Sequence, residues 1–114
     1  MAVGKIFAQL CCSDLEVSRP WFRALFGREP DAVPMPGLAE WHHAGSAGLQ
    51  LFENSRDAGH GTLTLVVSGI REEHARLATA GLEPGEIEPA TTTTLVQLRD
   101  PDGNLVVLAE PLGN

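Results

Sequence analysis

The sequence predicts an α+β fold in which two βαβββ repeats form a curled mixed sheet around a central cleft. The first observation behind this prediction is an internal repeat. The segment from Ser13 to Gly27 reappears as the segment from Ser68 to Gly81, and in both copies a proline stands three positions after the glycine. The same helix start and stop signals therefore occur twice. The second observation is that strand-like segments flank both helices at equivalent places.

The first repeat, about residues 1–56, contains a helix whose start depends on a proline. Asp14 or Ser18 can supply the N-terminal cap, because both side chains accept hydrogen bonds from backbone N–H groups. Pro20 fits only near a first turn, since deeper inside it would clash with the preceding turn. We therefore expect the helix to start close to Ser18 and to end at Gly27.

The strands follow from alternating apolar residues and from turn residues between them. In the first repeat they are expected at residues 5–12, 38–43 and 48–54, with at most a short edge strand within residues 30–36. The second repeat, about residues 60–112, is expected to contain strands at residues 62–67, 92–99 and 104–109, a weak strand at 86–89, and a helix at 70–80. The turn Asp100-Pro101-Asp102-Gly103 joins the last two strands.

Chain length predicts one domain over residues 1–114 and a homodimer. Each half has about 57 residues, too few to bury a secure core alone. The two halves therefore share one sheet system or pair with a second chain. We expect a homodimer, whose two chains lie side by side or exchange repeats.

Composition excludes several classes of partner. The net charge is −7 with only 8 Lys and Arg residues, which argues against nucleic acid and against anionic membranes. No signal peptide and no membrane-spanning run is recognised, so we expect a cytoplasmic protein. The adjacent Cys11 and Cys12 are poorly placed for a disulfide and are expected to be reduced, one facing inward and the other outward.

Two motifs carry a resemblance to a known superfamily. Cys12-Ser13-Asp14-Leu15 leads into a helix that ends in Leu25-Phe26-Gly27, and Asp100-Pro101-Asp102-Gly103-Asn104 precedes the final strand. With the paired repeat, these motifs resemble the vicinal oxygen chelate superfamily, which includes glyoxalase I, bleomycin-resistance proteins and extradiol dioxygenases. The resemblance covers essentially the whole chain. It implies a fold but no single reaction, because members of the superfamily differ in chemistry.

The resemblance implies four strand positions at which the superfamily's enzymes carry His and Glu metal ligands. The matching residues here are Phe7, Gln50, Thr62 and Val107. Two are apolar and two are neutral, so they lack the imidazole and carboxylate donors that a divalent ion prefers. We therefore expect no metal and no cofactor at this site.

The four histidines are the other candidate metal ligands. His42 and His43 are adjacent and are expected to point to opposite faces of a sheet, so only one can reach the cleft. His60 lies between two glycines in a loop and His74 in a charged helix face, and both are expected to be solvated. A metal, if bound, would require His60, His42 and glutamates as ligands.

The same strand positions predict the lining of a pocket for a small organic molecule. Apolar walls with a few amide and hydroxyl groups are typical of such sites, and one tryptophan can add an aromatic platform. The expected lining residues are Phe7, Gln9, Trp41, Gln50, Phe52, Thr62, Thr64 and Val107. Phe7 and Val107 have the alternative of filling the core.

The leading functional hypothesis is a metal-free small-molecule-binding protein of the glyoxalase/bleomycin-resistance type that sequesters a drug or metabolite of cationic or aromatic character. The acidic composition favours a cationic ligand. One alternative is an enzyme, either a metal-dependent lyase, isomerase or dioxygenase with atypical ligands, or a metal-independent isomerase that uses Gln50 and a bound water. Another alternative is a degenerate interaction domain whose cavity has filled.

Overall fold

A computed structural model describes residues 1–113, so the expected domain end at Asn114 lies outside the described residues. The first repeat contains β1 (Ile6–Cys12), α1 (Leu15–Phe26), β2 (Ala32–Met35), β3 (Leu38–His43) and β4 (Ala47–Glu53). The second contains β5 (Thr62–Val66), α2 (Ile70–Thr79), β6 (Glu88–Pro89), β7 (Thr93–Arg99) and β8 (Leu105–Pro111). The order βαβββ thus occurs twice.

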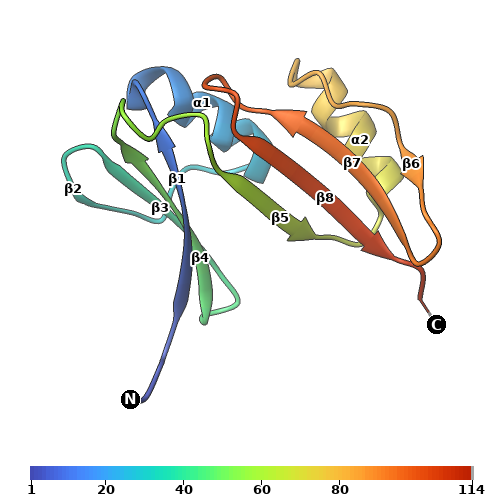
Figure 1. Cartoon of the computed structure of the whole chain (residues 1–114), viewed down its shortest axis with the longest axis horizontal. Coiled ribbons are helices and arrows are strands. Elements are labelled where there is room, and N and C mark those ends of the chain that lie inside the picture. Colours follow the sequence, from blue (N-terminus) through green and yellow to red (C-terminus); the bar gives the residue numbers. More distant parts are fainter. Residues whose placement is uncertain (114) are drawn as a thin grey trace.

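Each repeat forms its own four-stranded mixed sheet. Sheet A has the strand order β1-β4-β3-β2 and sheet B the order β5-β8-β7-β6. In each sheet the first and last strands of the repeat run parallel, and the remaining neighbours are antiparallel. Figure 1 shows the sheets side by side with the helices behind them. The α+β fold of paired βαβββ repeats is confirmed, and the two sheets do not close on each other.

The start of α1 differs from the expectation. The helix begins at Leu15, and Pro20 lies inside it. Asp14 is the cap, and its side chain accepts a hydrogen bond from the Glu16 N–H at 3.0 Å. Ser18 is buried and bonds its hydroxyl to Asp102 instead. The helix can start before the proline because its first N–H groups find acceptors outside the helix.

Those acceptors include a carboxylate from the last strand of the same repeat. Glu53, at the end of β4, accepts a hydrogen bond from the Leu15 N–H at 2.9 Å. In the second repeat Glu110, near the end of β8, accepts bonds from the Gly69 and Ile70 N–H groups. Both helices therefore receive a negative charge at the N-terminus, where the helix dipole favours one.

The hydrophobic core lies under the helices and joins the two repeats. Trp41 is completely buried against Phe22 and Phe26 of α1. Leu63 of β5 and Leu77 of α2 belong to the same cluster. Arg76 of α2 connects the helices, since its guanidinium donates to the Ala24 and Leu25 carbonyls at 2.8 and 2.6 Å.

Polar side chains from the turn between β7 and β8 tie the two repeats together. Asn104 is completely buried; its Nδ2 donates to the Cys11 carbonyl at 2.9 Å and its Oδ1 accepts from the Gly61 N–H at 2.8 Å. Asp100 holds Asn104 through a further side-chain bond of 2.8 Å. Asp102 accepts the Ser13 N–H and hydroxyl in front of α1. One turn of the second repeat thus fixes the end of β1 to the start of β5.

Replacing Asn104 tests this junction. Asn104→Ala leaves the Gly61 N–H and the Cys11 carbonyl without these partners in a buried place, so we expect a loss of about 3 kcal/mol in the free energy of unfolding. Urea denaturation measures it. Asn54→Ala, which removes only an exposed bond to Asp57, serves as the control and should cost less than about 0.5 kcal/mol. Equal losses in the two variants would contradict the role of Asn104.

Candidate functional site

The face of sheet A turned away from α1 carries a group of polar side chains; we call it the open face. In β3 and β4 the residues on the other face, among them Trp41, Leu49 and Leu51, fill the core. Strand alternation therefore directs their neighbours away from the helices. The open face includes Phe7, Gln9, Gln50 and Phe52, all of which were expected to line a pocket, and also Glu40 and His42.

Four side chains on the open face form one hydrogen-bonded row, which we call the relay. Gln9 Nε2 donates to Gln50 Oε1 at 3.0 Å, and Gln50 Nε2 donates to Glu40 Oε2 at 2.8 Å. His42 Nε2 lies 2.9 Å from Glu40 Oε1. The row crosses β1, β4 and β3, because Gln9 is paired with Gln50 and Gln50 with Glu40 in the strand registers.

Glu40 is the charged member of the relay. The residue is only 9 % exposed, yet its hydrogen bonds with His42 and Gln50 hold the pKa of its carboxyl below the usual value, against the opposing effect of burial. Glu40 is therefore ionised at neutral pH. An ionised carboxylate only accepts hydrogen bonds, so His42 Nε2 carries the proton in their contact.

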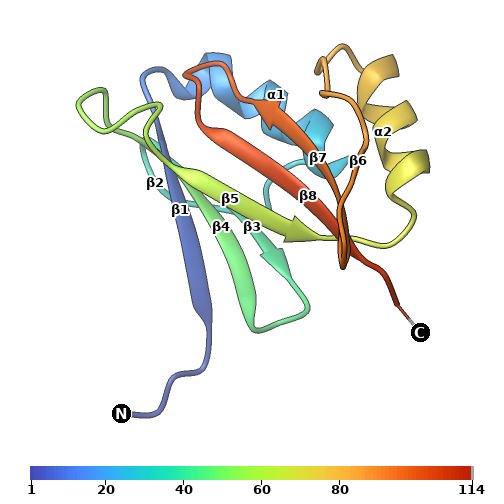
Figure 2. The ribbon, with the colours of Figure 1, turned by 45° about the vertical axis from the view of Figure 1, so that its right-hand side comes forward.

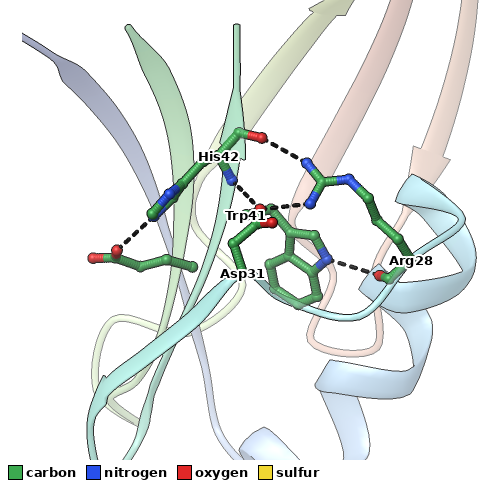
Figure 3. Close-up of polar contacts among 5 residues, drawn as sticks. Arg28, Asp31, Trp41 and His42 are labelled. Carbon is green, nitrogen blue, oxygen red and sulfur yellow. Dashed lines mark hydrogen bonds and ion pairs between the residues drawn. The ribbon is translucent and has the colours of Figure 1, made fainter. Parts of the chain in front are cut away.

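A clamp at the end of β3 sets the direction of His42. Asp31 accepts the His42 N–H at 2.7 Å, and Arg28 pairs with Asp31 and donates to the His42 carbonyl at 2.6 Å. Figure 3 shows this clamp, with the His42 and Trp41 side chains on opposite sides of the strand. The clamp holds the backbone from which His42 reaches Glu40.

Trp41 is placed differently from the expectation that it would supply an aromatic platform to the pocket. It lies on the core face of β3 with no exposed surface, and its Nε1 donates to the Arg28 carbonyl at 2.9 Å (Figure 3). The reason is the alternation of side chains along a strand. Trp41 stands between Glu40 and His42, which lie on the open face, so its own side chain points to the core. Trp41 therefore supports the site from behind and cannot touch a ligand on the open face.

Phe7 supplies the aromatic surface of the open face. Its ring packs edge-on against the His42 ring with centroids 5.7 Å apart, and Lys5 Nζ lies 5.4 Å above its centre. Gly48, paired with Phe7 in β4, makes this position possible, since a Cβ there would come within 2.6 Å of the ring. Phe52, half-buried, lies two residues along β4 from Gln50 on the same face.

The remaining expected pocket residues lie on sheet B. Thr62 and Thr64 are exposed on β5, and Val107 is half-buried on β8 opposite Thr64. They share one face of sheet B, whereas Gln9 and Gln50 contact each other on sheet A. The structure thus divides the expected lining between two sheets that do not close.

An open groove of about 580 Å³ lies between the two sheets and is lined by residues of both. Figure 2 shows that the ribbons of β1 and β5 diverge. Its lining includes Ile6, Ala8, Leu63, Val66, Phe26 and His43. His43 Nε2 is buried and has no hydrogen-bond partner within residues 1–113. Burial, followed by the charge of Arg28, lowers the His43 pKa, so this imidazole is neutral at pH 7. As predicted, His42 and His43 point to opposite faces of β3.

The other titratable candidates lie apart from the relay. His60 is exposed in its loop, as expected, but His74 is half-buried and bonds to the Gly85 carbonyl at 2.9 Å, which corrects its predicted solvation. Cys12 is buried and Cys11 half-buried, and both are free thiols. Burial and the nearby Asp102 raise the pKa of Cys12 to about 11, which disfavours a nucleophilic thiolate.

Sequence reasoning missed Glu40 as a site residue and treated His42 only as a possible metal ligand. A usable signal was present. A hairpin turn centred on Gly45 places Glu40 opposite Gln50 and puts His42 on the same face as both. Counting outward from that turn would have found the carboxylate and moved Trp41 to the core.

Comparisons with known proteins place this fold. No family model and no curated protein matches the sequence. A solved glyoxalase/bleomycin resistance protein from Catenulispora acidiphila is 28% identical, with a TM-score of 0.85 over 93% of this chain and 96% of that one. The chain belongs to the vicinal oxygen chelate superfamily. TnmS3, described as an antibiotic binding protein from Streptomyces sp. CB03234, is 21% identical with a TM-score of 0.82 over 97% of this chain and 98% of that one.

A third neighbour has the name of an enzyme. Lactoylglutathione lyase from Agrobacterium tumefaciens is 21% identical, with a TM-score of 0.76 over 92% of this chain and 91% of that one. At this identity the match shows the fold alone.

Neither helix in the described part of the chain is long and apolar enough to cross a membrane.

The residues at the four ligand positions of vicinal oxygen chelate enzymes do not fit a divalent metal. Phe7 and Val107 offer only carbon, Thr62 a hydroxyl, and the amide of Gln50 is bonded to Gln9 and Glu40. Within residues 1–113, no group of three or more His, Cys, Asp or Glu side chains is arranged to hold a metal ion. The polar chemistry of the open face is therefore that of its amides, one carboxylate, one imidazole and the Lys5 ammonium over Phe7.

The lowered pKa of Glu40 predicts how Glu40→Gln changes stability with pH. A carboxyl whose pKa is depressed by folding stabilises the native state above its unfolded pKa of about 4.3, and this contribution disappears as the pH falls through the folded pKa. We expect Glu40→Gln to be less stable than the wild type at pH 7, with a smaller difference at pH 3.5. Urea denaturation at both pH values measures this. A difference that grows on acidification would contradict the charge state assigned to Glu40.

Proposed function

We propose that this protein binds a small organic cation with an apolar or aromatic body on the open face of sheet A, and that it sequesters the ligand without chemical change. The observation that carries the proposal is Glu40. It is a nearly buried, ionised carboxylate in the middle of a face whose histidine serves as a hydrogen-bond donor and whose Lys5 ammonium lies over the Phe7 ring.

Charge favours a cationic ligand. At the effective dielectric constant near a protein surface, a carboxylate and an ammonium about 5 Å apart attract each other by about 3 kcal/mol. Loss of water from both groups cancels part of this energy. A net preference of about tenfold for a cation over a neutral molecule of the same shape is therefore expected. The net charge of −7 adds a weaker, long-range attraction.

The apolar borders of the relay suit the body of such a ligand. Phe7 and Phe52 lie on the same face as Gln9 and Gln50. Lys5 already places its ammonium over the Phe7 ring, so this ring accepts a cation within the chain itself. A ligand cation can take this position where the Lys5 side chain moves away from the ring. One similar structure is called an antibiotic binding protein and another a glyoxalase/bleomycin resistance protein; the first name, and the resistance part of the second, support a binding role.

Calorimetric titration with a matched pair of probes tests the proposal. Benzylammonium and benzyl alcohol have nearly the same shape but differ in charge. We expect benzylammonium to bind about tenfold more tightly, and we expect Glu40→Gln to remove this difference. Glu29→Gln is the control, because Glu29 is exposed and pairs with Arg19 and Arg23. Equal binding of both probes, or an unchanged preference in Glu40→Gln, would refute the proposal.

The proposal includes a homodimer in which a second copy covers the groove between β1 and β5. Both are edge strands, and edge strands are normally protected from unspecific pairing. Their large apolar side chains are unusually exposed, with Ile6 at 69 % and Val66 at 72 %. A second copy seated there would bury these side chains, offer a partner to His43 Nε2, and stand beside the open face.

The proposed location of the protein is the cytoplasm. The two free thiols suit this reducing compartment.

Light scattering after size-exclusion chromatography tests the dimer. We expect the wild type to have twice the mass of one chain, and Ile6→Lys or Val66→Lys to have the mass of one chain, because a buried lysine would prevent docking. Val17→Lys serves as the control, since Val17 is similarly exposed but lies on α1 outside the groove lining. A wild type with the mass of one chain would exclude this arrangement.

A further inference from the structure

The relay has a direction that Glu40 imposes. An ionised carboxylate can accept hydrogen bonds but cannot donate one. The Gln50 amide must therefore turn its NH2 group toward Glu40, at 2.8 Å, and its Oε1 toward Gln9. Gln9 must then turn its own NH2 group toward Gln50 Oε1, at 3.0 Å. The orientation of both amides follows from the charge on one carboxylate.

The Gln9 end of the relay consequently presents a hydrogen-bond acceptor to a ligand. With its NH2 group held by Gln50, Gln9 presents its Oε1 on the other side of the amide. No residue in the described part of the chain donates a hydrogen bond to this oxygen, and Gln9 is exposed. If Gln9 were turned over, its Oε1 would face Gln50 Oε1, and two acceptors would stand 3 Å apart with no hydrogen between them.

The geometry points to a specific class of ligand. We propose that Gln9 Oε1 selects cations that carry N–H groups, namely primary or secondary ammonium, amidinium or guanidinium groups, over quaternary ammonium groups of equal charge. The inference rests on the proposed function and narrows its ligand class. Gln9 contacts the ligand, whereas Gln50 and Glu40 are positioning residues that fix which end of the Gln9 amide faces it.

Two properties of the relay strengthen the selection. Hydrogen bonds in a row polarise one another, so the charge of Glu40 makes Gln9 Oε1 a better acceptor than an isolated amide. The carboxylate also attracts any cation to the open face, although more weakly at Gln9 than beside Glu40, because the Gln50 amide stands between these two residues. Charge thus brings a cation to the open face, and the carbonyl oxygen distinguishes among cations by their hydrogens. A quaternary ammonium group satisfies the first requirement but not the second.

Titration with a second matched pair tests the inference. Benzylammonium and benzyltrimethylammonium carry the same charge, but only the first has N–H groups. A hydrogen bond from a charged donor changes affinity by about tenfold or more, so we expect benzylammonium to bind about tenfold more tightly to the wild type. Gln9→Met, which keeps the length of the side chain but removes the amide, gives the preference that arises from size alone.

The variant Gln50→Met tests whether Gln50 acts by orienting the Gln9 amide, which contacts the ligand. This variant keeps Gln9 and the charge of Glu40 but removes the amide that orients Gln9. We expect the preference for benzylammonium to fall toward the Gln9→Met value, and the side-chain amide proton signals of Gln9 in the NMR spectrum of the ligand-free protein to lose their hydrogen-bonded shift. A residue that only supports the fold would leave those signals in place.

The outcomes are distinct. A preference that is as large in Gln9→Met or in Gln50→Met as in the wild type, or equal binding of the two cations to the wild type, overturns the inference while the proposed function stands. If neither cation binds more tightly than benzyl alcohol, both the inference and the proposed function are overturned. A preference that is present in the wild type and lost in both variants supports the inference.

Discussion

The buried amide of Asn104 is the contact on which the arrangement of the two repeats depends. It joins the carbonyl of Cys11 at the end of β1 to the N–H of Gly61 before β5, and Asp100 holds it in place. Burying polar groups is favourable only when each finds a partner, and here three segments distant in sequence satisfy one another. This contact fixes where the sheets meet, and β1 and β5 diverge from there to leave the groove.

The same βαβββ unit has acquired different surfaces in its two copies. Glu53 and Glu110 serve their helices in the same way, so the scaffold is repeated down to its hydrogen bonds. Sheet A, however, carries an ionised carboxylate and two amides across three strands, whereas the corresponding face of sheet B presents Thr62, Thr64 and Val107. The hydrogen-bonded polar side chains are thus concentrated on the face of the first repeat, and the second repeat supplies the Asn104 junction.

Local signals allowed the paired repeat to be predicted, because helix caps, glycines and strand alternation act within a few residues. Contacts between distant residues decided what was missed. The carboxylate of Glu53 lets α1 start at Leu15, and nothing near Leu15 in the sequence announces it. The expectation that Trp41 lines the pocket fails because a single aromatic residue does not determine which side chains of a strand face the core, whereas the hairpin register does. The groove between the sheets could not be predicted from local sequence patterns, because the Asn104 contacts that join the sheets link residues far apart in the sequence.

The central claim is that the charge of Glu40 and the oxygen of Gln9 together receive a cation on the open face. A crystal structure of the protein with benzylammonium tests this claim most directly. The account predicts the ammonium nitrogen on the open face of sheet A, within hydrogen-bond distance of Gln9 Oε1, and the ring near Phe7. A probe bound in the groove between β1 and β5, or an ammonium group directed away from the relay, would contradict it.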